Sequence, residues 1–262
     1  MENLSLENLL ISRHYVEGYE PPAEDVYLRI RNEIIGSAGN FIVLSGLPKS
    51  GKSTFLNAII SSFFVGETLN LRLELCKKKL FFGYFDTESA PYDFYKNINR
   101  IKIMSNQKTL GVNFNAFNTR QDPAIINKLL IEQYISSYSV SVVFVDGLLD
   151  LINNYNDEVE SRQLIDWLKL ITTKYNILLI GVIHTGKKDN HTLGHFGSMI
   201  DRYAQSILEV TKDKEQSTFT LSAKYLRSAP EFEPITIKWN GNKYIECEYI
   251  EKENAPIRRQ RR

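Results

Sequence analysis

Apolar residues along this chain gather in short runs that each stop at a polar or charged residue. Nearly continuous apolar runs, typical of strands buried on both faces of a parallel sheet, occupy residues 41–45, 80–85, 142–145 and 177–183. Helical spacing of apolar residues is found over residues 54–60, 92–104 and 158–175. Strand and helix therefore alternate, which predicts an α/β fold with a mostly parallel central sheet flanked by helices.

The pattern changes from about residue 205 onward. Short segments of alternating polarity, typical of half-exposed strands, cover residues 206–211, 217–223, 234–239 and 243–249. Asn240-Gly241-Asn242 has the composition of a tight turn between the last two segments. We therefore expect the sheet to finish in antiparallel C-terminal hairpins.

Residues 1–40 are expected to form a helical lead-in, in which Pro21-Pro22 separates two amphipathic pieces. A Gly/Ser-rich turn over residues 36–40 precedes the first strand. The predicted organisation is a helical N-terminal arm (1–34), one α/β domain (35–250) and a basic C-terminal tail (251–262).

Composition narrows the classes of partner. The 262 residues include 32 Lys and Arg against 31 Asp and Glu, so the whole chain has no field that attracts nucleic acid or an anionic membrane, and any basic surface must be local. Cys76 and Cys247 lack metal-ligand spacing and are expected to be reduced thiols. Without an apolar stretch of about 20 residues, a cytoplasmic protein with no membrane partner is expected.

The segment Gly46–Ser53 fits the pattern G-x-x-x-x-G-K-[ST] between a predicted strand and a predicted helix. Such a loop directs backbone N–H groups at phosphates and opens a helix whose dipole favours an anion. Lys52 would reach the β- and γ-phosphates, and the Ser53 hydroxyl would ligate Mg²⁺. The residues expected to bind the nucleotide are Gly46, Pro48, Lys49, Ser50, Gly51, Lys52, Ser53 and Thr54. A turn that matches the pattern by chance is the alternative.

Three later strands end in side chains suited to phosphate chemistry. Asp146 is expected to hold Mg²⁺ opposite Ser53, and Asp150 is the alternative for this role. Glu88 is expected to polarise the attacking water, and Asp86 is the alternative for that role. His184 is expected to contact the γ-phosphate or that water. Helix capping by the carboxylates and a structural role for the histidine are the alternatives.

Together these positions resemble the RecA-like ATPases, the group that contains RecA, the hexameric replicative helicases and the plasmid helicase RepA. The resemblance covers roughly residues 35–240 and includes Asp86-Thr87-Glu88, which is similar to the D-x-E element of that family. It implies that the chain hydrolyses ATP with Mg²⁺ and that Glu88 is the general base. It also implies that Asp146 is the carboxylate beside Mg²⁺ and that His184 is the sensor of the γ-phosphate. It also implies that Tyr95 stacks on adenine; a buried helix aromatic is the alternative.

Lys224 and Arg227 come at the end of a predicted strand. In the resembled ring helicases, a Lys and an Arg at this place reach the γ-phosphate of a neighbouring subunit, usually as K-x-R, whereas this chain has K-x-x-R. The resemblance implies a homo-oligomer with shared ATP sites, as a hexameric ring or as a filament. Two solvated strand-end cations are the alternative.

The segment 185–197 is long, basic and follows His184 directly. The corresponding loop of the resembled family faces the central channel, which implies single-stranded DNA as partner. Lys187 and Lys188 would follow the strand backbone, while His195 or Phe196 would stack on bases. Residues 153–156 are a second candidate loop, and a solvated loop is the alternative.

Two other functions compete with a DNA-dependent motor. The first is a regulatory RecA-fold ATPase, like the circadian clock ATPases, which switches protein partners without moving on DNA. The second is a P-loop kinase, which has no Arg-rich lid in this sequence and leaves Glu88 and the terminal hairpins unexplained.

Overall fold

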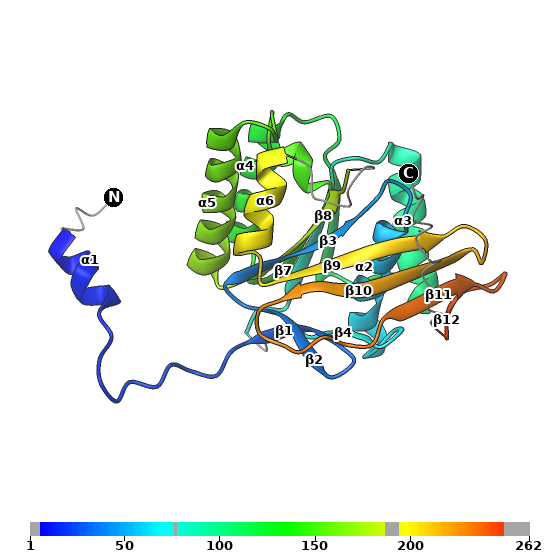
Figure 1. Cartoon of the computed structure of the whole chain (residues 1–262), viewed down its shortest axis with the longest axis horizontal. Helices are drawn as coiled ribbons and strands as arrows, with labels where there is room; N and C mark the ends of the chain where they lie inside the picture. The colour runs from blue at the N-terminus through cyan, green and yellow to red at the C-terminus, as the bar shows by residue number, and fades with distance from the viewer. Residues whose placement is uncertain (1–5, 76–77, 187–193, 249–262) are drawn as a thin grey trace, which may run out of the picture.

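The computed structural model describes residues 6–75, 78–186 and 194–248. A nine-stranded sheet with the strand order β12-β11-β10-β9-β3-β8-β7-β5-β6 forms its centre (Figure 1). Its parallel strands are β3 (Asn40–Gly46), β5 (Phe81–Asp86), β6 (Phe114–Asn118), β7 (Val140–Asp146), β8 (Leu178–His184) and β9 (Ser206–Asp213). The antiparallel strands β10 (Thr218–Leu226), β11 (Ile235–Trp239) and β12 (Tyr244–Cys247) complete it. The predicted fold class is confirmed.

Helices cover both faces of this sheet, which explains the continuous apolar runs in its strands. The helices are α2 (Lys52–Val65) and α3 (Pro91–Met104) on one face, and α4 (Ala124–Ser137), α5 (Glu158–Tyr175) and α6 (Gly194–Tyr203) on the other (Figure 1). In β3, Ile42 packs into the core with α2, whereas Val43 packs into the core with α5. Successive side chains of one strand therefore belong to two different cores.

The register of the parallel strands lines up their carboxyl ends. Gly46 at the end of β3 pairs with His184 at the end of β8, and Asp86 at the end of β5 pairs with Asp146 at the end of β7. A 3-10 turn, η1 (Leu148–Leu151), follows β7 directly. The strand-end residues singled out in the sequence thus share one edge of the sheet.

The N-terminal segment differs from the helical lead-in expected. Only α1 (Leu6–Arg13) is helical; β1 (Val26–Ile30) and β2 (Glu33–Ser37) form a hairpin, and β1 also pairs with β4 (Leu71–Leu73) in a second, three-stranded sheet. The expectation of a second helix after Pro21-Pro22 is wrong. Tyr27, Leu28 and Ile30 fit helical spacing, but they are buried as strand residues in the core that includes α2. The hairpin also crosses the boundary expected at residue 34.

Two details of the central sheet also differ from expectation. Strand β6 was not recognised in the sequence, because its burial is incomplete along an edge of the sheet and its pattern is weak. Strand β9 was grouped with the antiparallel hairpins but runs parallel to β3, so the direction of pairing first changes at β10.

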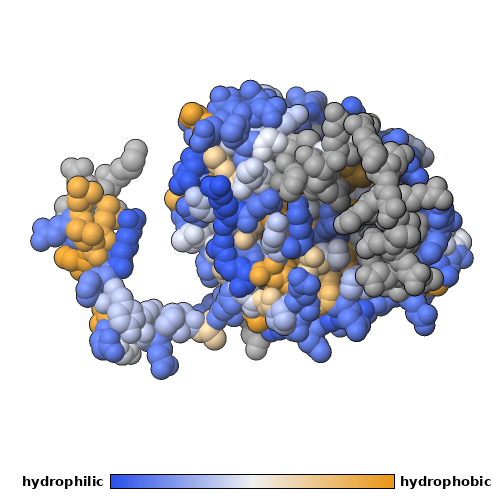
Figure 2. Space-filling model, in the orientation of Figure 1, coloured by the Kyte–Doolittle hydropathy of each residue, from blue (hydrophilic) through white to orange (hydrophobic). Residues whose placement is uncertain are grey.

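Helix α1 stands apart from the domain and buries none of its residues (Figures 1 and 2). Residues 14–25, which carry no helix or strand, connect it to β1 and are all exposed. The large apolar side chains exposed on this arm are Leu6, Leu10, Ile11, Tyr15, Val16 and Tyr19. No helix in the part of the chain that the structure describes has the length and apolar character needed to cross a bilayer.

Candidate active site

The loop Gly46–Ser53 connects β3 to the start of α2, as predicted, and two of its glycines cannot be replaced without a clash. Gly51 has a φ of 100°, and a Cβ placed on it would lie 2.5 Å from Cδ1 of Phe219. A Cβ on Gly46 would lie 2.3 Å from the backbone oxygen of Val210. The pattern G-x-x-x-x-G-K-[ST] therefore has a steric cause here, because the loop lies directly against β9 and β10.

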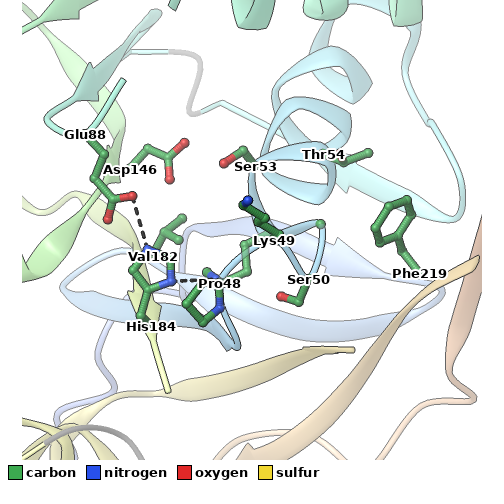
Figure 3. Close-up of a pocket in the computed structure, with 12 residues that line it drawn as sticks. Pro48, Lys49, Ser50, Ser53, Thr54, Glu88, Asp146, Val182, His184 and Phe219 are labelled. Atoms are coloured by element: carbon green, nitrogen blue, oxygen red, sulfur yellow. Dashed lines mark hydrogen bonds and ion pairs between the residues drawn. The ribbon is translucent and has the colours of Figure 1, made fainter. Parts of the chain in front are cut away.

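A cavity of about 400 Å³ opens beside this loop (Figure 3). Residues from the loop, the start of α2 and the neighbouring strand ends line it: Pro48, Lys49, Ser50, Gly51, Lys52, Ser53, Thr54, Glu88, Asp146, Val182, His184 and Phe219. Most of the residues predicted to bind nucleotide or metal are thus brought together around one space. Cavities of this size at the carboxyl edge of a parallel sheet are typical small-molecule sites.

Lys52 lies inside the loop, with its side chain directed at backbone oxygens. Its Nζ donates to the carbonyl oxygens of Gly46 and Leu47, each at 2.9 Å, and lies 3.0 Å from Nδ1 of His184. Burial lowers the pKa of Lys52 to about 8, against the opposing effect of the Glu88 and Asp146 carboxylates. The ammonium group is therefore poorly solvated, which strengthens its attraction for phosphate oxygens.

His184 joins Lys52 to Glu88. Because Lys52 can only donate, Nδ1 of His184 accepts its hydrogen bond, so Nε2 carries the proton and donates to Oε2 of Glu88 at 3.2 Å (Figure 3). The hydrogen bond from His184 is the main cause that lowers the pKa of Glu88, which keeps the carboxylate charged. A charged carboxylate at the rim of the cavity is what a general base for water requires.

Asp146 faces Ser53 across the cavity (Figure 3). Burial and, after it, the nearby carboxylate of Asp86 raise the pKa of Asp146 to about 7, against the opposing effect of a hydrogen bond from Ser53. Hydroxyl and carboxylate oxygens are the ligands that Mg²⁺ takes from proteins, and it is usually held by one or two such groups beside substrate phosphates. The two side chains therefore fit the predicted magnesium site, where a bound cation would neutralise the buried carboxylate and the phosphates.

Asp86 and Asp150, the two competing carboxylates, are engaged elsewhere. Oδ1 of Asp86 accepts from the backbone N–H groups of Glu88 and Ser89, at 3.1 and 2.8 Å, so Asp86 is fully buried and fixes the turn that presents Glu88. The Thr87 hydroxyl donates to Asp150 at 2.8 Å. Neither residue lines the cavity, so the geometry favours Glu88 and Asp146.

Tyr84 ties the two buried carboxylates together, and sequence reasoning missed it. Its hydroxyl lies 3.2 Å from Oδ2 of Asp86 and 3.3 Å from Oδ2 of Asp146. The signal that was available is strand alternation, which places residues 84 and 86 of β5 on the same face. Without that hydroxyl, two carboxylates would face each other in the core.

Tyr95, predicted to stack on adenine, is 58% exposed and stacks on Tyr92 of the same helix, with ring centroids 6.3 Å apart. It is not among the residues that line the cavity, so its role stays a prediction. The aromatic ring that does line the cavity belongs to Phe219 of β10, beside Thr54 (Figure 3). No sequence motif marks Phe219, because a single aromatic residue in an alternating strand is common.

Lys224 and Arg227 do not line the cavity. Lys224 lies where the pairing of β9 and β10 shifts register, and its Nζ is buried without a hydrogen-bond partner among the described residues. Arg227 donates from Nη2 to the backbone oxygen of Arg202 at 2.6 Å. Their proposed reach to a neighbouring site stays a prediction.

The start of α6 contacts the loop after β7. The backbone N–H of Phe196 donates to the backbone oxygen of Tyr155 at 3.2 Å. Phe196 is fully buried and has no free face for stacking on a base, whereas His195 is exposed. Lys187 and Lys188 lie outside the described residues.

Comparison with known proteins supports the fold. The family model described as an AAA domain matches residues 24–190. No curated protein matches the chain. Among solved structures, a KaiC-like protein of the hyperthermophilic archaeon Pyrococcus horikoshii OT3 superimposes with a TM-score of 0.57, 10% sequence identity, and coverage of 81% of this chain and 91% of that chain. This likeness shows a shared RecA-like fold.

Proposed function

The chain belongs to the AAA-domain family and is a P-loop ATPase of RecA-like fold, and on that premise we propose that it works on DNA as an oligomeric, helicase-like ATPase. The observation that carries the catalytic part is the hydrogen-bonded series Lys52, His184 and Glu88 beside Asp146. These side chains line one cavity, which supports the proposed roles of phosphate-binding cation for Lys52, sensor for His184 and base for Glu88.

Each group in this series has a distinct task in the proposed reaction. Lys52 binds the β- and γ-phosphates, and Glu88 orients and deprotonates the water that attacks the γ-phosphate. Ser53 and Asp146 would hold Mg²⁺, which supplies charge stabilisation at the phosphates. His184 contacts both Lys52 and Glu88, so a change at the γ-phosphate reaches the loop after β8 through a single side chain.

We propose that the working form is a homo-oligomer, as a hexameric ring, in which Lys224 and Arg227 of one subunit act on the ATP of the next. Two features support this arrangement: these cations lie away from the cavity of their own chain, and the N-terminal arm exposes a series of large apolar residues. Exposed apolar segments of this kind mark protein contacts.

Mass measurement tests the assembly. Light scattering with a non-hydrolysable ATP analogue should give a multiple of the 30.2 kDa chain. Removal of residues 1–24 should lower the number of subunits in the assembly. Removal of residues 251–262 serves as the control and should leave that number unchanged. A strict monomer under all conditions would exclude the shared site.

The proposed role in DNA rests on the contact between the start of α6 and the loop after β7, and on the exposed His195 at the start of α6. ATP hydrolysis should accelerate when single-stranded DNA is added, and DNA binding should weaken with salt. An ATPase that neither binds DNA nor responds to it would favour the alternative, a regulatory ATPase that switches protein partners.

A further inference from the structure

A second groove, separate from the nucleotide cavity, lies between α3 and the hairpin of β11 and β12. Its volume is about 270 Å³. Helix α3 contributes Lys96, Arg100 and Ile103, which share one face of the helix because they are four and three residues apart. The hairpin contributes Trp239 and Lys243 on either side of its turn.

The charge of this groove is one-sided. Lys96, Arg100 and Lys243 line it, and no carboxylate is among its lining residues. Asp93, one turn before Lys96, pairs with that lysine at 3.0 Å, but both side chains are more than half exposed. The guanidinium of Arg100 donates from Nη1 to Oδ1 of Asn97 at 3.0 Å, and it pairs with no carboxylate among the described residues. In a chain with nearly balanced charge, this local excess favours an anionic ligand.

Trp239 gives the groove a flat apolar surface. The indole is 51% exposed, and Tyr244 on the opposite strand supports it edge-on, with ring centroids 5.2 Å apart and an interplanar angle of 66°. Ile103, 60% exposed, lines the groove from the helix side. Exposed aromatic rings beside cations are the arrangement that binds bases and phosphates of single strands together.

The groove is also joined to the nucleotide cavity by aromatic contacts. Tyr244 packs edge-to-face against Phe219, with centroids 6.2 Å apart, and Phe219 lines the cavity beside Gly51. Trp239, Tyr244 and Phe219 therefore form a continuous series of rings between the two spaces. A ligand in the groove contacts one end of that series, and a nucleotide the other.

We propose that the groove between α3 and the β11–β12 hairpin binds single-stranded nucleic acid, with Trp239 stacked on a base and Lys96, Arg100 and Lys243 on phosphates. The identity of this polymer rests on the proposed role in DNA, but the site is distinct from the loops after β7 and β8. An acidic polypeptide would satisfy the cations but would leave the indole without a flat partner.

Trp239 makes the groove directly observable. The chain has two tryptophans, so in a Trp167→Phe background the emission belongs to Trp239 alone. Titration with a 20-nucleotide oligothymidylate should quench this emission to saturation. The affinity should fall with salt, with a log–log slope of about 0.7 per phosphate contact, or about 2 for three cations.

Two variants test the residues of the groove. Lys96→Ala/Arg100→Ala/Lys243→Ala should reduce the salt slope by about 2 and weaken binding. Trp239→Ala, followed by fluorescence anisotropy of a labelled oligonucleotide, should weaken binding about 5- to 150-fold. The control, Lys128→Ala/Lys169→Ala/Lys174→Ala, removes the same charge from α4 and α5 and should bind as wild type. Unchanged basal ATPase rate and circular dichroism would show that the variants fold.

The possible failures differ from one another. If oligothymidylate binds wild type and the groove variants equally, the groove is not the site, while the role in DNA stands. If polyglutamate quenches Trp239 as strongly as oligothymidylate, the groove takes acidic polypeptides and the inference is overturned. If wild type binds no oligothymidylate, the groove inference and the DNA role both fail, while ATP hydrolysis measured alone still tests the catalytic part.

Discussion

The carboxyl edge of the parallel strands and the end of β10 both carry charged side chains. The two regions differ in whether these side chains have hydrogen-bond or ion-pair partners. At the parallel edge, His184 contacts both Lys52 and Glu88, so the cation and the carboxylate share one partner within the chain. At the end of β10, neither Lys224 nor Arg227 pairs with a carboxylate among the described residues. The candidate binding and base groups are therefore held in place within one chain, whereas Lys224 and Arg227 have no anionic partner in the part of the chain that the structure describes.

The largest expected effect comes from removing a cation at the end of β10. Arg227→Ala should reduce ATP turnover about 10³- to 10⁵-fold, the range reported for fingers in phosphoryl transfer. Mixing Arg227→Ala with Glu88→Gln should restore part of the activity, because an interface formed by both variants combines an intact base with an intact finger. Steady-state phosphate release from the mixture measures this.

Arg202→Ala is the matched control for this experiment. It removes the same charge from an exposed neighbour of Arg227 and should leave turnover near wild type. Absence of any recovery in mixtures of the two variants, despite proven co-assembly, would place all catalytic groups within one chain.

Glu88→Gln alone should lower kcat about 10²- to 10⁴-fold, because the amide keeps the shape of the side chain but accepts no proton from water. Nucleotide affinity should be unchanged, since Lys52 and the loop remain. Titration with a fluorescent ATP analogue, compared with phosphate release, separates the two quantities. Normal turnover would mean that Glu88 is not the base.

His184→Ala should lower kcat about 10- to 100-fold, because hydrogen bonds to charged groups contribute about 1.5–3 kcal/mol. His184→Gln retains a donor and an acceptor on one side chain and should keep more activity than the alanine variant. Equal rates for the two variants would argue against a bridging role between Lys52 and Glu88.

Tyr84→Phe should give the smallest effect, a loss of about 1 kcal/mol in the free energy of unfolding, because the hydroxyl shared by Asp86 and Asp146 is removed. Urea denaturation measures this loss. Tyr95→Phe removes the same hydroxyl from an exposed ring and should change stability by less than about 0.5 kcal/mol. A Tyr84→Phe protein as stable as wild type would mean that water replaces the hydroxyl.

Four of the parallel strands were predictable because burial on both faces leaves a strong record in the sequence. Strands β3, β5, β7 and β8 are continuous apolar runs; β3 ends at the expected loop, and the other three end at the expected polar residues. The N-terminal hairpin was not predictable in this way, since Tyr27, Leu28 and Ile30 are compatible with either period. Its strand conformation is stabilised by pairing with β4, more than thirty residues away in the sequence.

The residues of the candidate site also fall into two groups, those that the sequence identifies and those that it does not. Lys52, Ser53, Glu88, Asp146 and His184 were identified because a motif or a strand end marks each of them, and the cavity brings them together. Phe219 and Tyr84 carry no such mark. Their positions depend on how β10 and β5 lie against the loop and the neighbouring strand, which is a property of the sheet as a whole.

The exposed connection between α1 and β1 limits how far α1 can lie from the domain but does not fix its orientation. Residues 14–25 extend at most about 40 Å and contain neither helix nor strand that would fix a direction. In the proposed assembly, a contact made through this arm would keep adjacent domains close together without fixing the angle between them. A flexible tether of this kind suits an oligomeric ATPase whose subunit interfaces would open and close in each cycle of hydrolysis.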